Sequence, residues 1–196
     1  MRSVITFLAA SALAASQTFA ALPEGAPAPE FQAPASLAGS QFTYSLKEML
    51  KKGPVVVYFY PSAFTGGCNL EAHTFALNKA KFDSIGVSII GVSLDDIARL
   101  NSFSADSNYC AGKIAVASDS SGDIAKRYDL HIHPAASGLK DTRGVEIDHG
   151  FAERTTFLVN TDGKIFASIG GISPAENVDK TLEAARQLVA SKKTGK

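Results

Sequence analysis

Two continuous apolar runs dominate the hydrophobic pattern of the chain. Pro54–Tyr60 (PVVVYFY) is β-branched and aromatic throughout, and Val87–Ser93 (VSIIGVS) has a similar composition. Runs in which polar residues do not alternate with apolar ones are typical of strands that are buried on both faces. We therefore expect both segments to be buried strands of a central sheet.

Shorter patterns predict the remaining elements. Helical spacing or capping signals predict helices over Ser45–Lys52, Asn69–Ser84, Asp95–Ala105, Ser121–Tyr128 and Pro174–Ala190. Short apolar runs predict further strands over Ile114–Ala117, Thr155–Asn160 and Lys164–Ile169. The Asp162-Gly163 pair is a strong hairpin signal and should join the last two strands. This order of elements predicts an α/β fold with a mixed sheet and helices on both faces.

Two regions lack a clear period. Leu22–Gly39 is rich in Pro and Ala and should be extended, and His131–Glu153 should be a long loop. We expect an extended lead-in over residues 21–44, one domain over residues 45–190 and a flexible basic tail over residues 191–196.

The first twenty residues have the pattern of a secretory signal peptide. Arg2 precedes the apolar stretch Val4–Ala15, and Thr18-Phe19-Ala20 supplies the small residues of a cleavage site. A membrane anchor is the alternative, but the apolar stretch is shorter than the roughly 20 residues of a span. We expect cleavage after Ala20, export to the periplasm and no membrane attachment of the mature chain.

Composition suits one globular domain and gives no sign of a polyanionic partner. Of 196 residues, 45% are hydrophobic, and 19 basic residues balance 19 acidic ones. Because nucleic-acid binding usually needs a basic excess, we expect no nucleic-acid partner.

The stretch Pro61–Cys68 (PSAFTGGC) leaves a predicted buried strand and enters a predicted helix. Unpaired N–H groups and the helix dipole favour an anion at a helix start, and the thiolate is the nucleophilic form of cysteine. Gly66 and Gly67 leave room for approach, and the Thr65 hydroxyl is available for a hydrogen bond. The alternative is a buried structural Cys68 after a plain Gly-Gly turn.

Pro61, Thr65 and Cys68 match the Pro-x-x-x-Thr-x-x-Cys motif, and the chain resembles the peroxiredoxin family from about Gly25 to Ala190. Glu153–Asn160, followed by Asp162-Gly163, resembles the family segment that places an arginine, here Arg154, near the reactive sulfur. Without the motif, Arg154 would be an ordinary surface ion-pair residue.

The resemblance implies a thioredoxin-like fold, with a central mixed sheet flanked by helices, and reduction of hydrogen peroxide or small organic hydroperoxides. Cys68 would attack the peroxide and become a sulfenic acid. Arg154, Thr65 and helix-start N–H groups would stabilise the leaving charge, while Pro61 would shape the pocket. It implies no cofactor, a thioredoxin-like or small-thiol reductant, and a monomer or homodimer.

Glu71 resembles a glutamate of the bacterioferritin-comigratory subgroup and is expected to support Arg154 or the backbone; a solvated helix glutamate is the alternative.

The bacterioferritin-comigratory subgroup often has a second cysteine five residues after the first, where this chain has His73. Cys110, 42 residues after Cys68, resembles the second cysteine of the thiol peroxidase subgroup. The resemblance implies that Cys110 resolves Cys68 after local unwinding; a one-Cys enzyme is the alternative.

Other functions depend on patterns that this chain lacks or leaves open. A thiol–disulfide oxidoreductase usually carries Cys-x-x-Cys, but Thr65 and Glu71 occupy the positions three residues from Cys68. A copper chaperone would want a cysteine at position 72, which is Ala72. A redox sensor with the same fold stays open. His131 and His133 form only a weak metal signal, so we expect no metal site.

Overall fold

The computed structural model describes residues 21–194, so the predicted signal peptide lies outside the described residues. A seven-stranded mixed sheet, in the order β2-β1-β5-β4-β3-β8-β9, forms the centre. Its strands are β1 (Gln32–Leu37), β2 (Ser40–Ser45), β3 (Val55–Phe59), β4 (Ser88–Ser93), β5 (Ala115–Ser118), β8 (Thr155–Val159) and β9 (Ile165–Gly170). The helices are α1 (Leu46–Leu50), α2 (Gly66–Asp83), α3 (Ile97–Ala105), α4 (Asp123–Arg127) and α5 (Pro174–Thr194).

The two apolar runs form the middle of this sheet, which confirms the prediction. β3 is buried at every position and pairs parallel with β4 on one side and antiparallel with β8 on the other. β4 in turn pairs parallel with β5, and β8 and β9 form the predicted hairpin around Asp162-Gly163. The fold is therefore the expected thioredoxin-like arrangement.

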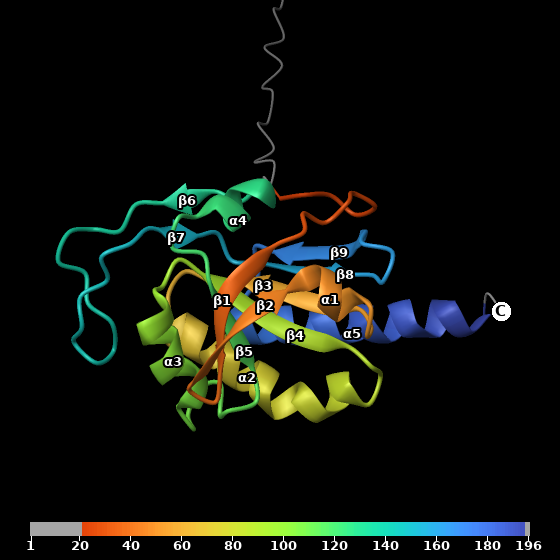
Figure 1. Ribbon diagram of the computed structural model, residues 1–196, viewed down its shortest axis with the longest axis horizontal. Helices are drawn as coiled ribbons and strands as arrows, with labels where there is room; N and C mark the ends of the chain where they lie inside the picture. Colours follow the sequence, from red (N-terminus) through yellow and green to blue (C-terminus); the bar gives the residue numbers. More distant parts are fainter. Residues whose placement is uncertain (1–20, 195–196) are drawn as a thin grey trace, which may run out of the picture.

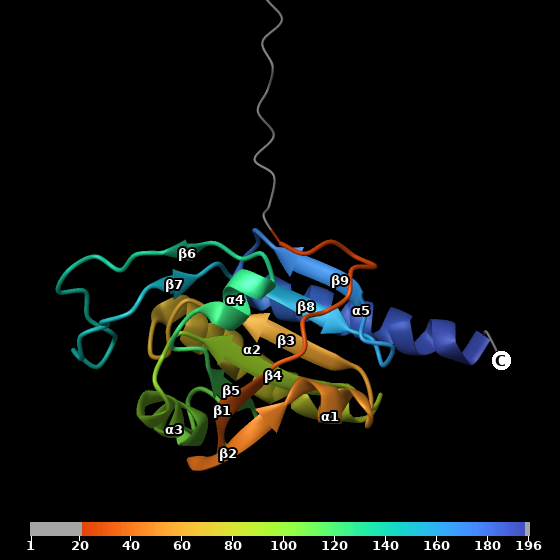
Figure 2. The ribbon, with the colours of Figure 1, turned by 45° about the horizontal axis from the view of Figure 1, so that its top comes forward.

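The sheet separates two hydrophobic cores, because successive side chains of a strand point to opposite faces. Tyr58 of β3 packs in the core under α2, α3 and α5, whereas Phe59 packs in the core under α1 and α4. Figures 1 and 2 show these two groups of helices on opposite sides of the sheet. Both Cys68 and Cys110 belong to the first core.

The lead-in is extended, as expected, but its second half forms a hairpin that joins the sheet. β1 pairs antiparallel with both β2 and β5, so residues 32–45 are part of the central sheet. Ala38 and Gly39 make the turn with φ values of 51° and 79°. A turn with two positive φ values usually has the sequence Asn-Gly or Asp-Gly. Here alanine occupies the first position, so the sequence did not predict the turn.

Two further segments differ from the expected irregular structure. Residues 131–153 contain a short two-stranded sheet of β6 (Ile132–His133) and β7 (Phe151–Ala152), too short to show a period. Between them an outer loop, residues 134–150, extends beyond one end of the sheet (Figures 1 and 2). The segment expected as a tail instead continues α5 to Thr194, since no glycine or proline interrupts it before Gly195.

Candidate active site

Cys68 lies in the first turn of α2, which the segment Tyr60–Thr65 connects to the end of the central strand β3. Thr65 is the N-cap residue and the helix begins at Gly66, which places Cys68 third in the helix. Its side chain is only 2% exposed. The first N–H groups of a helix have no intrahelical partner, so the sulfur stands where backbone donors favour negative charge.

Arg154 joins the sulfur to a buried carboxylate. It precedes β8, and its Nη2 donates a hydrogen bond to Cys68 Sγ at 3.3 Å. Its Nη1 forms an ion pair with Oε2 of Glu71, whose side chain is fully buried. The structure thus brings Cys68, Arg154 and Glu71 together as predicted, and the alternative of a solvated Glu71 is wrong.

Burial and the ion pair act in opposite directions on these two groups. Burial raises the pKa of Glu71 to about 7, although the Arg154 charge and hydrogen bond oppose the increase. Burial also disfavours charge on Arg154, but Glu71 and Cys68 outweigh it and raise the pKa of the guanidinium. A permanent cation is therefore held against the sulfur.

Thr65 is close in sequence to Cys68, but its hydroxyl proton is already used. Thr65 Oγ1 donates to the carbonyl oxygen of Ser62 at 2.8 Å rather than to the sulfur. Since a hydroxyl has one donor and two acceptor lone pairs, Thr65 offers an acceptor to a peroxide O–H in this arrangement. That differs from the expected donation to the leaving oxygen. Pro61, partly exposed, opens the active-site loop, which we define as Pro61–Thr65.

Cys110 lies in the turns that follow α3 and is fully buried. Burial, with a smaller effect of Asp106, raises the pKa of its thiol. Both thiols are free. The two regions meet through aromatic rings, since Phe64 of the active-site loop packs edge-on against Tyr109 with ring centroids 5.6 Å apart.

A buried polar network behind the active-site loop was not predicted from the sequence. The carboxylate of Asp95 accepts hydrogen bonds from Ser62 Oγ (2.9 Å), the Ala63 N–H (2.7 Å) and Ser93 Oγ (2.6 Å). Arg99 Nε lies 2.8 Å from the same carboxylate. The sequence did contain one signal for this network, because Asp95 is a charged residue just beyond the carboxyl end of the buried strand β4.

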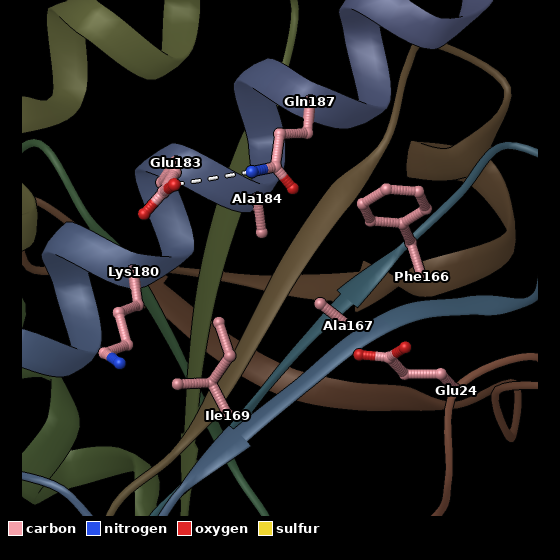
Figure 3. A pocket seen from close by; sticks show the side chains of 8 residues that line it. All are labelled: Glu24, Phe166, Ala167, Ile169, Lys180, Glu183, Ala184 and Gln187. Atoms are coloured by element: carbon pink, nitrogen blue, oxygen red, sulfur yellow. Dashed lines mark hydrogen bonds between the residues drawn. The ribbon is translucent and has the colours of Figure 1, made fainter.

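The cavity shown in Figure 3 lies away from this chemistry. It has a volume of about 410 Å³ and opens between β9 and α5, where Phe166, Ile169 and Lys180 are among its lining residues. None of its lining residues belongs to the Cys68 site, so we do not assign the reaction to it.

His131 and His133, the weak metal signal of the sequence, lie with ring centroids 5.0 Å apart. Within residues 21–194, no group of three or more His, Cys, Asp or Glu side chains is placed to hold a metal ion.

Comparisons with known proteins agree with this geometry. A family model described as the AhpC/TSA family matches residues 25–168. A peroxiredoxin relative from Mycobacterium tuberculosis is 30% identical over 144 residues, which span 73% of this chain and 84% of the relative. Peroxiredoxin Bcp of Xanthomonas campestris is 28% identical over 160 residues, 82% of this chain and 92% of the relative. The crystal structure of peroxidoxin BcpB from Mycobacterium tuberculosis superposes with a TM-score of 0.69 at 26% identity, covering 84% of this chain and 97% of that one.

Proposed function

The chain belongs to the AhpC/TSA family and is a thiol-dependent peroxidase, and from this premise we propose that Cys68 is the residue that attacks the peroxide. The single observation that supports this assignment best is the hydrogen bond from the Arg154 guanidinium to Cys68 Sγ at 3.3 Å. The thiolate is the nucleophilic form of cysteine, and this contact places a fixed positive charge beside the sulfur that attacks.

The proposed reaction follows from these contacts. The Cys68 thiolate attacks one oxygen of hydrogen peroxide or a small organic hydroperoxide, and the O–O bond breaks. The sulfur becomes a sulfenic acid, and the other oxygen leaves with the electron pair and takes a proton. Arg154 and the N–H groups of the first turn of α2 stabilise that leaving charge, and the Thr65 hydroxyl orients the peroxide as an acceptor.

We further propose that Cys110 resolves the sulfenic acid. Its sulfur would displace the Cys68 hydroxyl, forming a disulfide and releasing water, and a thioredoxin-like protein or a small thiol would then reduce the disulfide. Both sulfurs are buried, and Cα atoms must come within about 7 Å for a disulfide. We propose that the first turn of α2 unwinds locally so that the two sulfurs meet.

Replacing each cysteine separates these steps. We expect Cys68→Ser to abolish peroxide consumption while the circular dichroism spectrum stays native. Cys110→Ser should still consume one equivalent of peroxide per chain and accumulate Cys68 sulfenic acid, visible by dimedone labelling and mass spectrometry.

Mass mapping of the wild type after one equivalent of peroxide should then show a Cys68–Cys110 disulfide. Wild-type turnover by Cys68→Ser contradicts the peroxidase assignment. A lasting sulfenic acid in the wild type contradicts only the resolving role, and oxidation that does not cycle with a thiol reductant supports the redox-sensor alternative.

The place of action is also a proposal. The signal-peptide pattern lies before residue 25, where the family match begins, and supports export to a periplasm with a mature chain that starts at Ala21. Within the described part of the chain, no helix is both long and apolar enough to cross a membrane. The intact mass of the protein recovered from expressing cells checks the cleavage site.

A further inference from the structure

His149 of the outer loop reaches into the polar network behind the active-site loop. Its side chain is 13% exposed, and its Nε2 lies 2.9 Å from Oδ1 of the fully buried Asp95. Asp95 is the residue that holds Ser62 and Ala63. One carboxylate thus connects the outer loop to the active-site loop.

The partners of His149 define its protonation state. The second ring nitrogen, Nδ1, lies 2.8 Å from the carbonyl oxygen of Gly150. A carbonyl oxygen only accepts, and so does the Asp95 carboxylate, which is ionised because it also receives Ser62, Ala63 and Ser93 donors. Both ring nitrogens therefore have to donate, and only the imidazolium has two N–H groups.

The outer loop also contacts the active-site loop directly, at Phe64. Thr142 donates two hydrogen bonds to the Phe64 carbonyl oxygen, from its N–H at 2.9 Å and its hydroxyl at 2.8 Å. The Arg143 guanidinium lies 3.2 Å from the centroid of the Phe64 ring. Phe64 has φ = 60°, a conformation that costs a non-glycine residue energy and persists only where its surroundings hold it.

We propose that His149 is a positioning residue of the peroxidase reaction: as the imidazolium it binds Asp95 and thereby holds the active-site loop in the conformation in which Cys68 reacts. The proposal rests on the proposed function of Cys68. It assigns to the outer loop a role that the active-site motif does not contain.

The charges around His149 determine how this contact responds to pH. Asp95 contacts His149 from the end of β4, and the Arg99 charge acts on it from α3. Arg99 also pairs with Asp95 and with Asp141 of the outer loop, and Asp141 pairs in turn with Arg143. Burial lowers the pKa of His149 and Arg99 adds to this, but the hydrogen bonds to Asp95 and Gly150 outweigh both and raise it above 6.5. The imidazolium contact, in which both ring nitrogens donate, is therefore complete below pH 6.5. As the pH rises through the raised value, the ring loses its charge and one of its two N–H donors.

Two substitutions separate the hydrogen bond from the titration. His149→Gln keeps a neutral donor near the Nε2 position, and His149→Leu removes the donor. We expect wild-type kcat/KM for hydrogen peroxide to fall on the basic side of its pH profile, and His149→Gln to lack that fall. His149→Leu should lose activity at every pH, by about tenfold, because small displacements of reacting groups have costs of this size. His133→Gln, an exposed histidine of β6, is the matched control and should keep the wild-type profile.

Two readouts do not depend on peroxide turnover. Nitrogen-15 NMR should show both His149 ring nitrogens protonated at pH 6.5, and the alkylation rate of Cys68 by iodoacetamide should change in His149→Leu. A neutral ring at pH 6.5, or a His149→Gln profile identical to that of the wild type, overturns the proposal. Turnover of peroxide by Cys68→Ser would instead overturn the proposed function of Cys68. The NMR experiment would still report the protonation state of His149, so the two failures can be told apart.

Discussion

At the scale of single residues, Glu71 combines full burial with an ion pair to the cation that contacts Cys68. Its pKa of about 7 in the folded protein exceeds the ordinary value of 4.5, so the native state holds this proton more tightly than the unfolded chain does. Folding stability linked to Glu71 is thus present below pH 4.5 and is lost as the pH rises through 7.

We therefore expect the free energy of unfolding of the wild type to fall relative to Glu71→Gln between pH 4.5 and pH 8. The difference should be on the order of 3 kcal/mol, since one pKa unit corresponds to about 1.4 kcal/mol. Urea unfolding at several pH values measures it. The control is Glu183→Gln, at an exposed glutamate of α5, whose free energy of unfolding should change with pH as the wild-type value does. If the free energy of unfolding of Glu71→Gln also followed the wild-type pH dependence, Glu71 would not titrate in this range.

The residues around the sulfur were predictable where they belong to short motifs. Pro61, Thr65, Cys68 and Arg154 were all identified because the motif and the second segment that resembles the peroxiredoxin family contain them. The burial of Glu71 was not decided, because the pattern of α2 is misleading. Leu70 and Leu77 are 49% and 67% exposed, while Glu71 is fully buried. A charged residue inside the core is stable only through its partner, and sequence spacing does not reveal Arg154 as that partner.

At the scale of elements, the first turn of α2 controls the distance between Arg154 and Cys68. A Cβ atom added at Gly67 would lie 3.3 Å from Arg154 Nη2 and 3.5 Å from Pro174. The first of these distances is tighter than most contacts of a Cβ atom, so the guanidinium that donates to Cys68 Sγ would have to shift by a few tenths of an ångström. We expect Gly67→Ala to lower kcat/KM for hydrogen peroxide by about tenfold.

Gly66→Ala is the matched control for this prediction. A Cβ at Gly66 meets nothing within 4 Å, and alanine loses less conformational freedom on folding than glycine does. Gly66→Ala should therefore keep its activity and gain slightly in thermal stability. Equal activity of the two variants would mean that the contact between Arg154 and the sulfur does not limit the reaction.

Element prediction succeeded where apolar runs are long and failed where a turn determines the structure. β3 and β4 were evident because buried parallel strands need continuous apolar residues. The β1–β2 hairpin was missed because Pro34 argues against a strand and Ala38 occupies a left-handed turn position. β6 and β7 pair only two residues each, fewer than any periodic pattern needs.

At the scale of the whole molecule, residues distant in sequence meet only because the sheet brings their ends together. Asp95 and His149 are 54 residues apart, and no local pattern links them. The same sheet separates the molecule into a core that contains Cys68 and Cys110 and a second core on the opposite face. Loss of packing should therefore have different consequences on the two faces.

Phe103 and Phe31 test this separation with the same substitution. Phe103, in the first core, packs against Phe64 and Tyr109 with ring centroids 5.1 and 5.5 Å away. Phe31, in the second core, packs against Tyr44 and Tyr128 at 5.7 and 6.3 Å. We expect both Phe103→Leu and Phe31→Leu to lower the free energy of unfolding by about 1–2 kcal/mol, since both remove buried ring atoms.

Only Phe103→Leu should also reduce kcat/KM, by about fivefold, because Phe64 of the active-site loop loses the ring that supports it. Urea unfolding and steady-state peroxide consumption, measured on both variants at one pH, give the two quantities independently. An equal loss of activity in Phe31→Leu would contradict the separation, since it would mean that the rate follows global stability. An unchanged rate in Phe103→Leu would mean that the contacts of the outer loop alone keep Phe64 in place.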